Sequence, residues 1–362
     1  MATRYSSGHT MITTETTPDN STVRVELVNR ASVRMRVAHS VLKATVRPFV
    51  DWYFGIAESG PLRGARAFRV ANFADVLAAP LVPPRGTLRR PVSFDQFRAE
   101  WLWHRDDPGP DAVERGAILY FHGGAFVAGG LNSHRRLVAR IARASGVALL
   151  NVDYTQLPKG HLLDSIDDAV AAYEHLLARG FTPPRIVFAG DSAGGGLAFA
   201  AALAVRDRGL PMPAAIAAIA PYADFDSTTR SAHPNNETDA VLSAYGLSVP
   251  PTVGFARDGD IDPRWSPVNR DFTGMPAALI QVGNTEVLLA DTELLASRHL
   301  EANVPLTVQI WDNAIHVFQA GADLLPEART AIAEIGAFVR RALDDASLDM
   351  TAPPSVPEGA PS

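Results

Sequence analysis

Residues 190–195, with the sequence Gly-Asp-Ser-Ala-Gly-Gly, constrain the fold more than any other stretch of the chain. They lie between a short apolar run, Ile186 to Ala189, and a helix-forming run, Leu197 to Val205. A strand that ends in Gly-x-Ser-x-Gly and turns at once into a helix is a nucleophile elbow, in which the serine occupies a sharp turn. The helix N-terminus favours negative charge at the serine oxygen. The pattern predicts Ser192 as a nucleophile, and a glycine-rich turn without chemistry is the alternative for this hexapeptide alone.

Strand and helix patterns alternate on both sides of this turn. We expect strands at residues 97–104, 117–121, 148–154, 186–189, 215–219, 278–282 and 306–311, and helices at 137–144, 163–178, 197–205, 292–301 and 328–342. Ser133 is expected to cap the first of these helices. Such alternation predicts an α/β fold with a mostly parallel sheet and helices on both faces.

A long irregular segment interrupts the alternation. Residues 225–261 are polar and rich in Asn, Pro and Gly, with one helix expected at 239–245. An insertion of this length is more often a lid or a binding element than a structureless loop. We therefore divide the chain into an N-terminal segment (1–75), a core (76–224 and 262–345), a cap insertion (225–261) and a disordered tail (346–362). The N-terminal segment is expected to form cap helices at 30–44 and 48–58 and to contribute no strand to the sheet. Disorder is also expected at residues 1–22.

Composition narrows the classes of partner. A chain of 362 residues with 47% apolar and 20% charged residues is ordinary for a globular protein. The net charge of −6 argues against a nucleic-acid partner. With no cysteine there is no disulfide and no thiolate metal site, which fits a reducing compartment. We find no secretory signal and no apolar run of the ~18 residues that span a bilayer, so the sequence predicts a cytoplasmic protein without a membrane segment.

A second motif, at residues 122–126, directly follows the expected strand that ends at Phe121. Its sequence is His-Gly-Gly-Ala-Phe, and two glycines after a buried strand let successive N–H groups point outward, as an oxyanion hole requires. A plain turn is the alternative for this motif alone. The expected donors are the N–H groups of Gly123 and Gly124, and the Ala193 N–H is the remaining one. His122 is expected to orient this loop rather than to act as a base.

A serine nucleophile needs a base and an acid that holds the base in place. His316 follows the last expected strand, which suits the chain order serine, acid, histidine. The acid should follow the strand at 278–282, where Glu286 and Asp291 compete. Because Asp291 is well explained as a helix N-cap, we favour Glu286.

Taken together, these motifs resemble the hormone-sensitive lipase family of α/β-hydrolases over residues 97–343. The resemblance rests on residues 120–124 (Tyr-Phe-His-Gly-Gly), 190–195, 266–267 (Ser-Pro) and 316–318 (His-Val-Phe). It implies a bacterial carboxylesterase with a helical cap, the nucleophile Ser192, the base His316 and the acid Glu286. It also implies oxyanion donors at Gly124, Ala125 and Ala193.

The chain departs from this family at three places. The family usually has a third glycine where this chain has Ala125, so a side chain here borders the acyl pocket. The family acid is usually aspartate, whereas Glu286 is longer. Residues 154–159 read Tyr-Thr-Gln-Leu-Pro-Lys where the family has Tyr-Arg-Leu-Ala-Pro-Glu, which changes the charge network behind the elbow without removing a catalytic group.

The expected activity is hydrolysis of short to medium acyl esters through an acyl-enzyme, with a small-molecule ester as partner and no cofactor or metal. The N-terminal helices and the insertion are expected to roof the site and to bury the acyl chain against side chains such as Trp52 and Phe54. Two alternatives stay open: an amidase or peptidase on the same fold, and a non-catalytic module that binds an acyl ligand. The sequence also leaves open whether the chain forms a homodimer.

Overall fold

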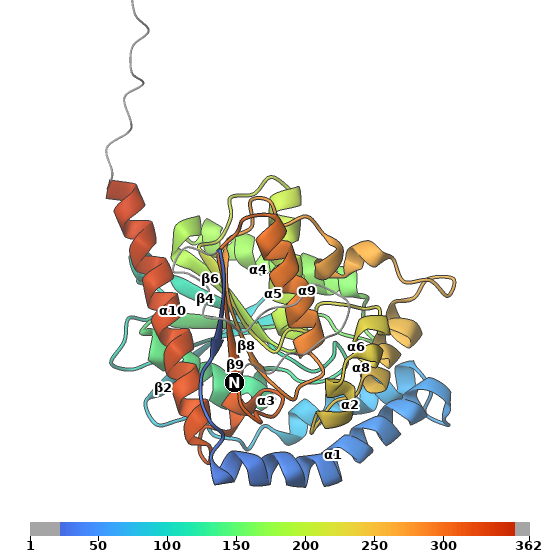
Figure 1. Ribbon diagram of the computed structural model, residues 1–362. Helices are drawn as coiled ribbons and strands as arrows, with labels where there is room; N and C mark the ends of the chain where they lie inside the picture. The colour runs from blue at the N-terminus through green and yellow to red at the C-terminus, as the bar shows by residue number, and fades with distance from the viewer. Residues whose placement is uncertain (1–21, 352–362) are drawn as a thin grey trace, which may run out of the picture.

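A nine-stranded sheet forms the centre of the computed structural model, which describes residues 22–351 (Figure 1). Its strand order is β1-β9-β8-β7-β6-β4-β5-β3-β2, and only the β2–β3 and β3–β5 pairs are antiparallel. The strands are β1 (Val23–Leu27), β2 (Thr87–Ser93), β3 (Arg98–His104), β4 (Ala117–Phe121), β5 (Ala148–Asp153), β6 (Ile186–Asp191), β7 (Ala215–Ile219), β8 (Ala277–Gly283) and β9 (Leu306–Trp311). The mostly parallel sheet confirms the predicted α/β class.

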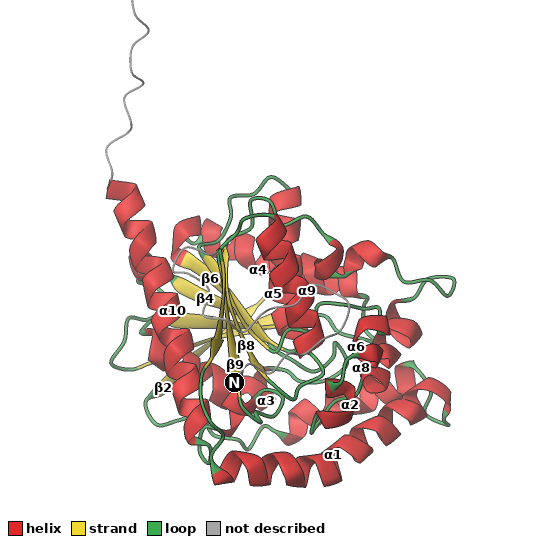
Figure 2. Ribbon diagram, in the orientation of Figure 1, coloured by secondary structure: helices red, strands yellow, loops and turns green. Residues whose placement is uncertain are grey.

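Helices cover both faces of this sheet (Figure 2). Helices α3 and α10 pack together on one face, and α4, α5 and α9 lie on the other. The helices are α1 (Val33–Ser59), α2 (Ala65–Leu77), α3 (Leu131–Ser145), α4 (Leu162–Ala178), α5 (Ala193–Asp207), α6 (Thr228–Ala232), α7 (Asn235–Thr238), α8 (Ala244–Pro250), α9 (Leu289–Glu301) and α10 (Pro326–Thr351). Because both faces are covered, the central strands are mostly apolar, and every residue of β4 and of β6, including Asp191, is buried.

Two edge strands correct the sequence analysis. Residues Val23–Leu27 were expected to contribute no strand, yet they form β1, which pairs in parallel with β9. The strand Thr87–Ser93 was not predicted, and it pairs with β3 at the opposite edge. Both strands are only partly buried and carry charged residues, so their apolar alternation is weak and their position depends on the partner strand.

Several helix predictions also need correction. The two helices expected at 30–44 and 48–58 form a single helix, α1, with Pro48 inside it. The helix expected at 239–245 is wrong in position, since most of these residues connect α7 to α8. Ser133 is the third residue of α3 rather than its N-cap, and its hydroxyl accepts the Gly130 N–H at 3.1 Å. Residues 346–351, expected to be disordered, belong to α10. The disorder expected at 1–21 and 352–362 lies outside the described residues.

The N-terminal helices and the helices of residues 225–261 pack together, although they lie far apart in sequence. Figure 1 shows α1, α2, α6 and α8 gathered beside one end of the sheet. Tyr245 of α8 donates its hydroxyl proton to Glu58 of α1 at 2.7 Å, and the Arg47 guanidinium donates to the Asn236 carbonyl at 2.7 Å. Phe54 is buried in this contact, but Trp52 is 60% exposed and points away from it, which corrects its expected place in the acyl pocket.

Candidate active site

Ser192 sits on a strained turn between β6 and α5. Its φ of 53° and ψ of −121° are unusual for a residue with a side chain, and it lies immediately before the first residue of α5. A Cβ atom at Gly190 would overlap the Gly194 carbonyl, and one at Gly194 would overlap the Phe121 carbonyl. The glycines therefore permit the close approach of strand, helix and neighbouring loop that the sequence analysis predicted.

His316 and Glu286 are brought together by the loops that follow β9 and β8. The His316 Nδ1 atom lies 2.8 Å from Glu286 Oε2, and the Gly283 N–H donates to Glu286 Oε1 at 2.7 Å. Burial raises the pKa of Glu286 despite these bonds. Burial lowers the pKa of His316, but the bond to the Glu286 carboxylate and its negative charge raise it more, so that its pKa lies above the ordinary imidazole value.

The loops that carry this pair are joined to each other. The Asn313 N–H donates to the side-chain oxygen of Asn284 at 2.8 Å, and the Thr285 hydroxyl donates to the Ala314 carbonyl at 3.4 Å. These bonds set the position of Glu286 relative to the histidine loop. Among residues 22–351 no hydrogen bond joins the Ser192 hydroxyl to His316. Ser192 follows β6 and His316 follows β9, so both lie at the carboxyl-end edge of the parallel sheet.

Asp291, the competing acid, lies elsewhere. Helix α9 begins at Leu289, so Asp291 is inside its first turn and is not the N-cap that the sequence suggested. Its fully buried carboxylate accepts the N–H groups of Ala223 and Asp224, each at 2.9 Å, and pairs with the buried Arg230 guanidinium at 2.9 Å. These bonds engage both of its oxygens and hold the start of the cap insertion.

The loop after β4 carries three successive residues with positive φ, namely Gly124, Ala125 and Phe126. The N–H groups of Gly124 and Ala125 donate to no other residue in the described part of the chain. Ala193 is the first residue of α5, where a helix leaves its N–H groups without an internal acceptor. These three N–H groups can therefore donate to an oxyanion, as an oxyanion hole requires.

Gly123 was predicted to be an oxyanion donor, but it does not belong to that set. Its N–H donates to Asp191 Oδ1 at 3.1 Å and is therefore occupied. The Tyr120 hydroxyl donates to the same oxygen at 2.7 Å, and His134 Nε2 lies 3.3 Å from Asp191 Oδ2. Burial raises the pKa of Asp191, but His134 and Tyr120 lower it more, so the carboxylate stays charged and anchors the base of the loop.

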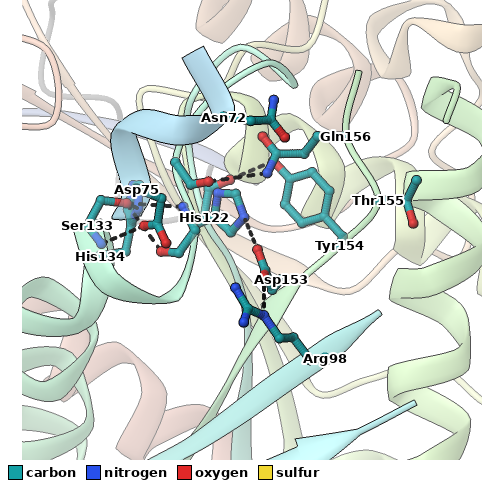
Figure 3. A network of polar contacts seen from close by, with 12 residues as sticks. Asn72, Asp75, Arg98, His122, Ser133, His134, Asp153, Tyr154, Thr155 and Gln156 are labelled. Carbon is teal, nitrogen blue, oxygen red and sulfur yellow. Dashed lines mark hydrogen bonds and ion pairs between the residues drawn. The ribbon is translucent and has the colours of Figure 1, made fainter. Parts of the chain in front are cut away.

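Polar side chains from the N-terminal segment hold the outer part of the same loop (Figure 3). Asn72 of α2 donates through its amide nitrogen to the carbonyls of Val127 at 2.7 Å and Leu157 at 2.9 Å. Asp75 accepts the Ser133 N–H at 2.8 Å. His122, which was expected to orient the loop, is fully buried and its Nδ1 lies 2.8 Å from the Gly123 carbonyl. Helix α2 is thus fastened to the loop after β4.

Two residues of the cap insertion hold the acid loop in a similar way. The Asn235 side-chain amide donates to the carbonyl oxygens of Asn284 at 2.9 Å and Glu286 at 2.8 Å. Asp239 accepts the Val287 N–H at 2.7 Å. The sequence analysis missed Asn72, Asn235 and Asp239, because their partners are backbone groups distant in sequence and no local motif marks them.

Aromatic side chains fill the space between the loop after β4 and the cap insertion. Phe126, which is buried, packs with its ring centroid 5.9 Å from that of Phe225 and 5.6 Å from that of Phe255. The rings of Phe225 and Tyr222 are 5.3 Å apart. This cluster forms a dense apolar wall beside the three available N–H groups.

Within residues 22–351 we find no group of three or more His, Asp or Glu side chains placed to hold a metal ion. In the same part of the chain, every helix is too short or too polar to cross a membrane.

A parallel sheet, a strained Gly-x-Ser-x-Gly turn and a His–Glu pair at the strand ends define the α/β-hydrolase class of fold and site. A family profile described as "alpha/beta hydrolase fold" matches residues 118–320. "Esterase LipU" of Mycobacterium tuberculosis is 37% identical over 274 residues, covering 74% of this chain and 92% of that protein. An "Acetyl-hydrolase" of Streptomyces hygroscopicus is 38% identical over 251 residues, covering 69% and 82%.

Solved structures agree with these relatives. A crystal structure of the esterase EstE5, soaked with p-nitrophenyl butyrate, superposes with a TM-score of 0.75 and is 32% identical, covering 87% of this chain and all of that one. An esterase described as belonging to the bacterial hormone-sensitive lipase family gives a TM-score of 0.72 at 30% identity, again covering 87% of this chain and 100% of that chain. The chain belongs to the α/β-hydrolase family and is an enzyme of the carboxylesterase/lipase type.

Proposed function

We propose that Ser192, His316 and Glu286 are the catalytic triad of a carboxylic-ester hydrolase that acts on short to medium acyl esters. The observation that carries this proposal is the 2.8 Å bond between His316 and a buried carboxylate whose other oxygen is held by the Gly283 N–H. This pair follows β8 and β9, and a serine held in a strained turn at the N-terminus of a helix follows β6 of the same parallel sheet. The names of the relatives support ester hydrolysis as the reaction.

In the proposed mechanism the Ser192 oxygen attacks the ester carbonyl carbon while His316 Nε2 takes the hydroxyl proton. The carbonyl electron pair becomes an oxyanion held by the N–H groups of Gly124, Ala125 and Ala193. Collapse of this intermediate breaks the bond to the alcohol, which leaves with the proton from His316. Water then attacks the acyl-serine by the same steps, releasing the carboxylic acid and restoring the serine. Glu286 holds the Nδ1 proton and stabilises the imidazolium throughout.

The preference for short to medium acyl groups follows from the surroundings of the serine. Ser192 is buried, and the aromatic wall of Phe126, Phe225 and Phe255 occupies part of the space next to the oxyanion donors. Each methylene that fits into such an apolar site contributes about 0.8 kcal/mol, and one that does not fit contributes nothing or clashes. The cytoplasmic location remains a prediction from the sequence.

Rates with p-nitrophenyl acetate, butyrate, octanoate and palmitate test the proposal. We expect the highest kcat/KM with one of the first three and the lowest with palmitate. The p-nitroanilides of the same acids test the amidase alternative, because the triad chemistry serves both bonds. Anilide turnover equal to ester turnover would contradict the assignment as an esterase, and a maximum with palmitate would contradict the proposed depth of the pocket.

A further inference from the structure

The outer surface of α1 and α2 is unusually apolar for a surface exposed to water. Of eighteen large apolar side chains that are exposed in the described part of the chain, twelve lie between residues 33 and 82. Isolated exposed apolar residues are normal, but a concentration on one element marks a contact surface. Those on the two helices, each more than half exposed, are Val33, Val37, Val41, Phe49 and Trp52 of α1 and Val70, Phe73, Val76 and Leu77 of α2.

On α1 these side chains form a single stripe. The exposed residues Val33, Val37, Val41, Ala44, Pro48 and Trp52 follow one another at intervals of four, four, three, four and four residues. This spacing keeps side chains on one face of a helix. The opposite face packs against α8 and buries Phe54. Figure 1 shows α1 along the outer edge of the molecule. The residues of the stripe are exposed, whereas Met35, Phe54 and Ala57 of the same helix are buried.

The same segment carries a positive charge that contrasts with the rest of the chain. Residues 28–86 contain nine Lys and Arg against three Asp and Glu, a net charge of +6, whereas the whole chain carries −6. Of the nine cationic side chains, only Arg47 lies within ion-pair distance of a carboxylate in the described residues. The exposed cations on or beside the two helices are Arg34, Arg36, Lys43, Arg63, Arg66 and Arg69.

We propose that this face, made of the exposed apolar and cationic residues of α1 and α2, docks on the surface of an anionic lipid bilayer. Helices that lie in a bilayer surface combine an apolar stripe with Lys and Arg, because the stripe enters the acyl boundary while the cations meet anionic headgroups. A second copy of the chain is a poorer occupant, since it would oppose two faces of net positive charge. A nucleic acid would use the cations but leave the apolar stripe uncovered.

Docking of this face has a consequence for the active site. Helix α2 is fastened by Asn72 to the loop after β4, so the docked helices lie next to the proposed oxyanion donors. Docking would therefore bring the loop after β4 close to the bilayer surface, where esters with apolar chains accumulate. The docking itself does not depend on the proposed triad, and its test uses binding rather than turnover.

Sedimentation of the full chain with vesicles tests the proposal. We expect binding to phosphatidylcholine vesicles that contain phosphatidylglycerol, little binding to phosphatidylcholine alone, and weaker binding at high salt. The double variant Val37→Glu/Val41→Glu and the single variant Trp52→Glu should abolish binding. The double variant Arg66→Gln/Arg69→Gln should weaken it by about 25-fold, since each cation near an anionic surface contributes about fivefold.

Matched controls separate docking from general effects of charge. Leu300→Glu changes an apolar side chain of α9 that is 57% exposed, and Arg105→Gln removes an exposed arginine that pairs with no carboxylate in residues 22–351. Both should bind vesicles as the wild type does. Absence of wild-type binding to either vesicle would overturn the proposal, as would equal binding by Trp52→Glu. A wild-type dimer in sedimentation velocity that becomes monomeric in Trp52→Glu would instead assign the face to self-association.

Discussion

The substitution Glu286→Gln tests the role of the acid through the hydrogen bonds that fix its two oxygens. In the wild type, Oε1 accepts the Gly283 N–H and Oε2 lies against His316 Nδ1. In the glutamine variant, the Gly283 N–H still requires an oxygen at the first position. The amide nitrogen must therefore face Nδ1 and donate to it, which moves the imidazole proton to Nε2, where it blocks acceptance of the Ser192 proton.

The size of the effect follows from the two orientations of the amide. Reversing it would place two donors together at Gly283, and an unsatisfied buried donor costs about 1–3 kcal/mol. The reversed orientation is the one that would let the amide oxygen accept the Nδ1 proton of His316 and so allow catalysis. It is disfavoured by a factor of roughly 5 to 150. Loss of the negative charge beside the imidazolium lowers the rate further. In another serine hydrolase, replacing the triad aspartate by asparagine lowers turnover by about 10⁴. We expect kcat to fall by roughly 10³ to 10⁴.

Steady-state hydrolysis of p-nitrophenyl butyrate, with circular dichroism as a check on folding, measures this effect. Glu301→Gln is the matched control, because Glu301 is an exposed partner of Arg298 and lies outside the proposed site. It should retain wild-type kcat. A folded Glu286→Gln enzyme with kcat within about tenfold of the wild type would refute the assignment of Glu286 as the acid.

Three further predictions concern the surroundings of the triad. Asp291→Asn should lower the free energy of unfolding in urea by about 3–5 kcal/mol, because it leaves the buried Arg230 without its charge partner; a change below about 0.5 kcal/mol would show that this pair is not structural. The value of kcat/KM should fall at acid pH with an apparent pKa above the ordinary imidazole value of 6.5, because His316 must be neutral to act as a base and Glu286 raises its pKa. An apparent pKa below 6.5 would contradict the effect of Glu286 on His316. Asn72→Ala should lower kcat by about 10²-fold with little change in KM, because the carbonyls of Val127 and Leu157 lose their donor and the loop after β4 becomes less fixed. An unchanged kcat would show that α2 does not position that loop.

The central fold was predictable because its signals are local. β7 is a short apolar run and β9 alternates apolar with polar residues, and each lies between two helices. Their predicted bounds coincide with those observed. The edge strand β1 was missed because its burial is partial and its pairing with β9 joins residues at opposite ends of the chain. Helix α8 was misplaced by several residues because its position depends on packing against α1 rather than on its own periodicity.

In the site, too, the residues marked by a local motif were predictable and those held by distant contacts were not. The elbow at Ser192 was predictable because a strained turn demands glycine at fixed positions nearby. The occupation of the Gly123 N–H by Asp191 could not be predicted, because it depends on the register of β4 against β6. The anchors Asn235 and Asp239 act through backbone groups and leave no pattern in the sequence.

Covalent labelling of Ser192 tests the central claim most directly. An organophosphate probe should add once to the wild-type chain, and peptide mass spectrometry should place the adduct on the peptide that contains Ser192. The Ser192→Ala variant should remain folded, take up no label and lose ester hydrolysis. An adduct on another residue, or hydrolysis by Ser192→Ala within about tenfold of the wild type, would contradict a triad built on this serine.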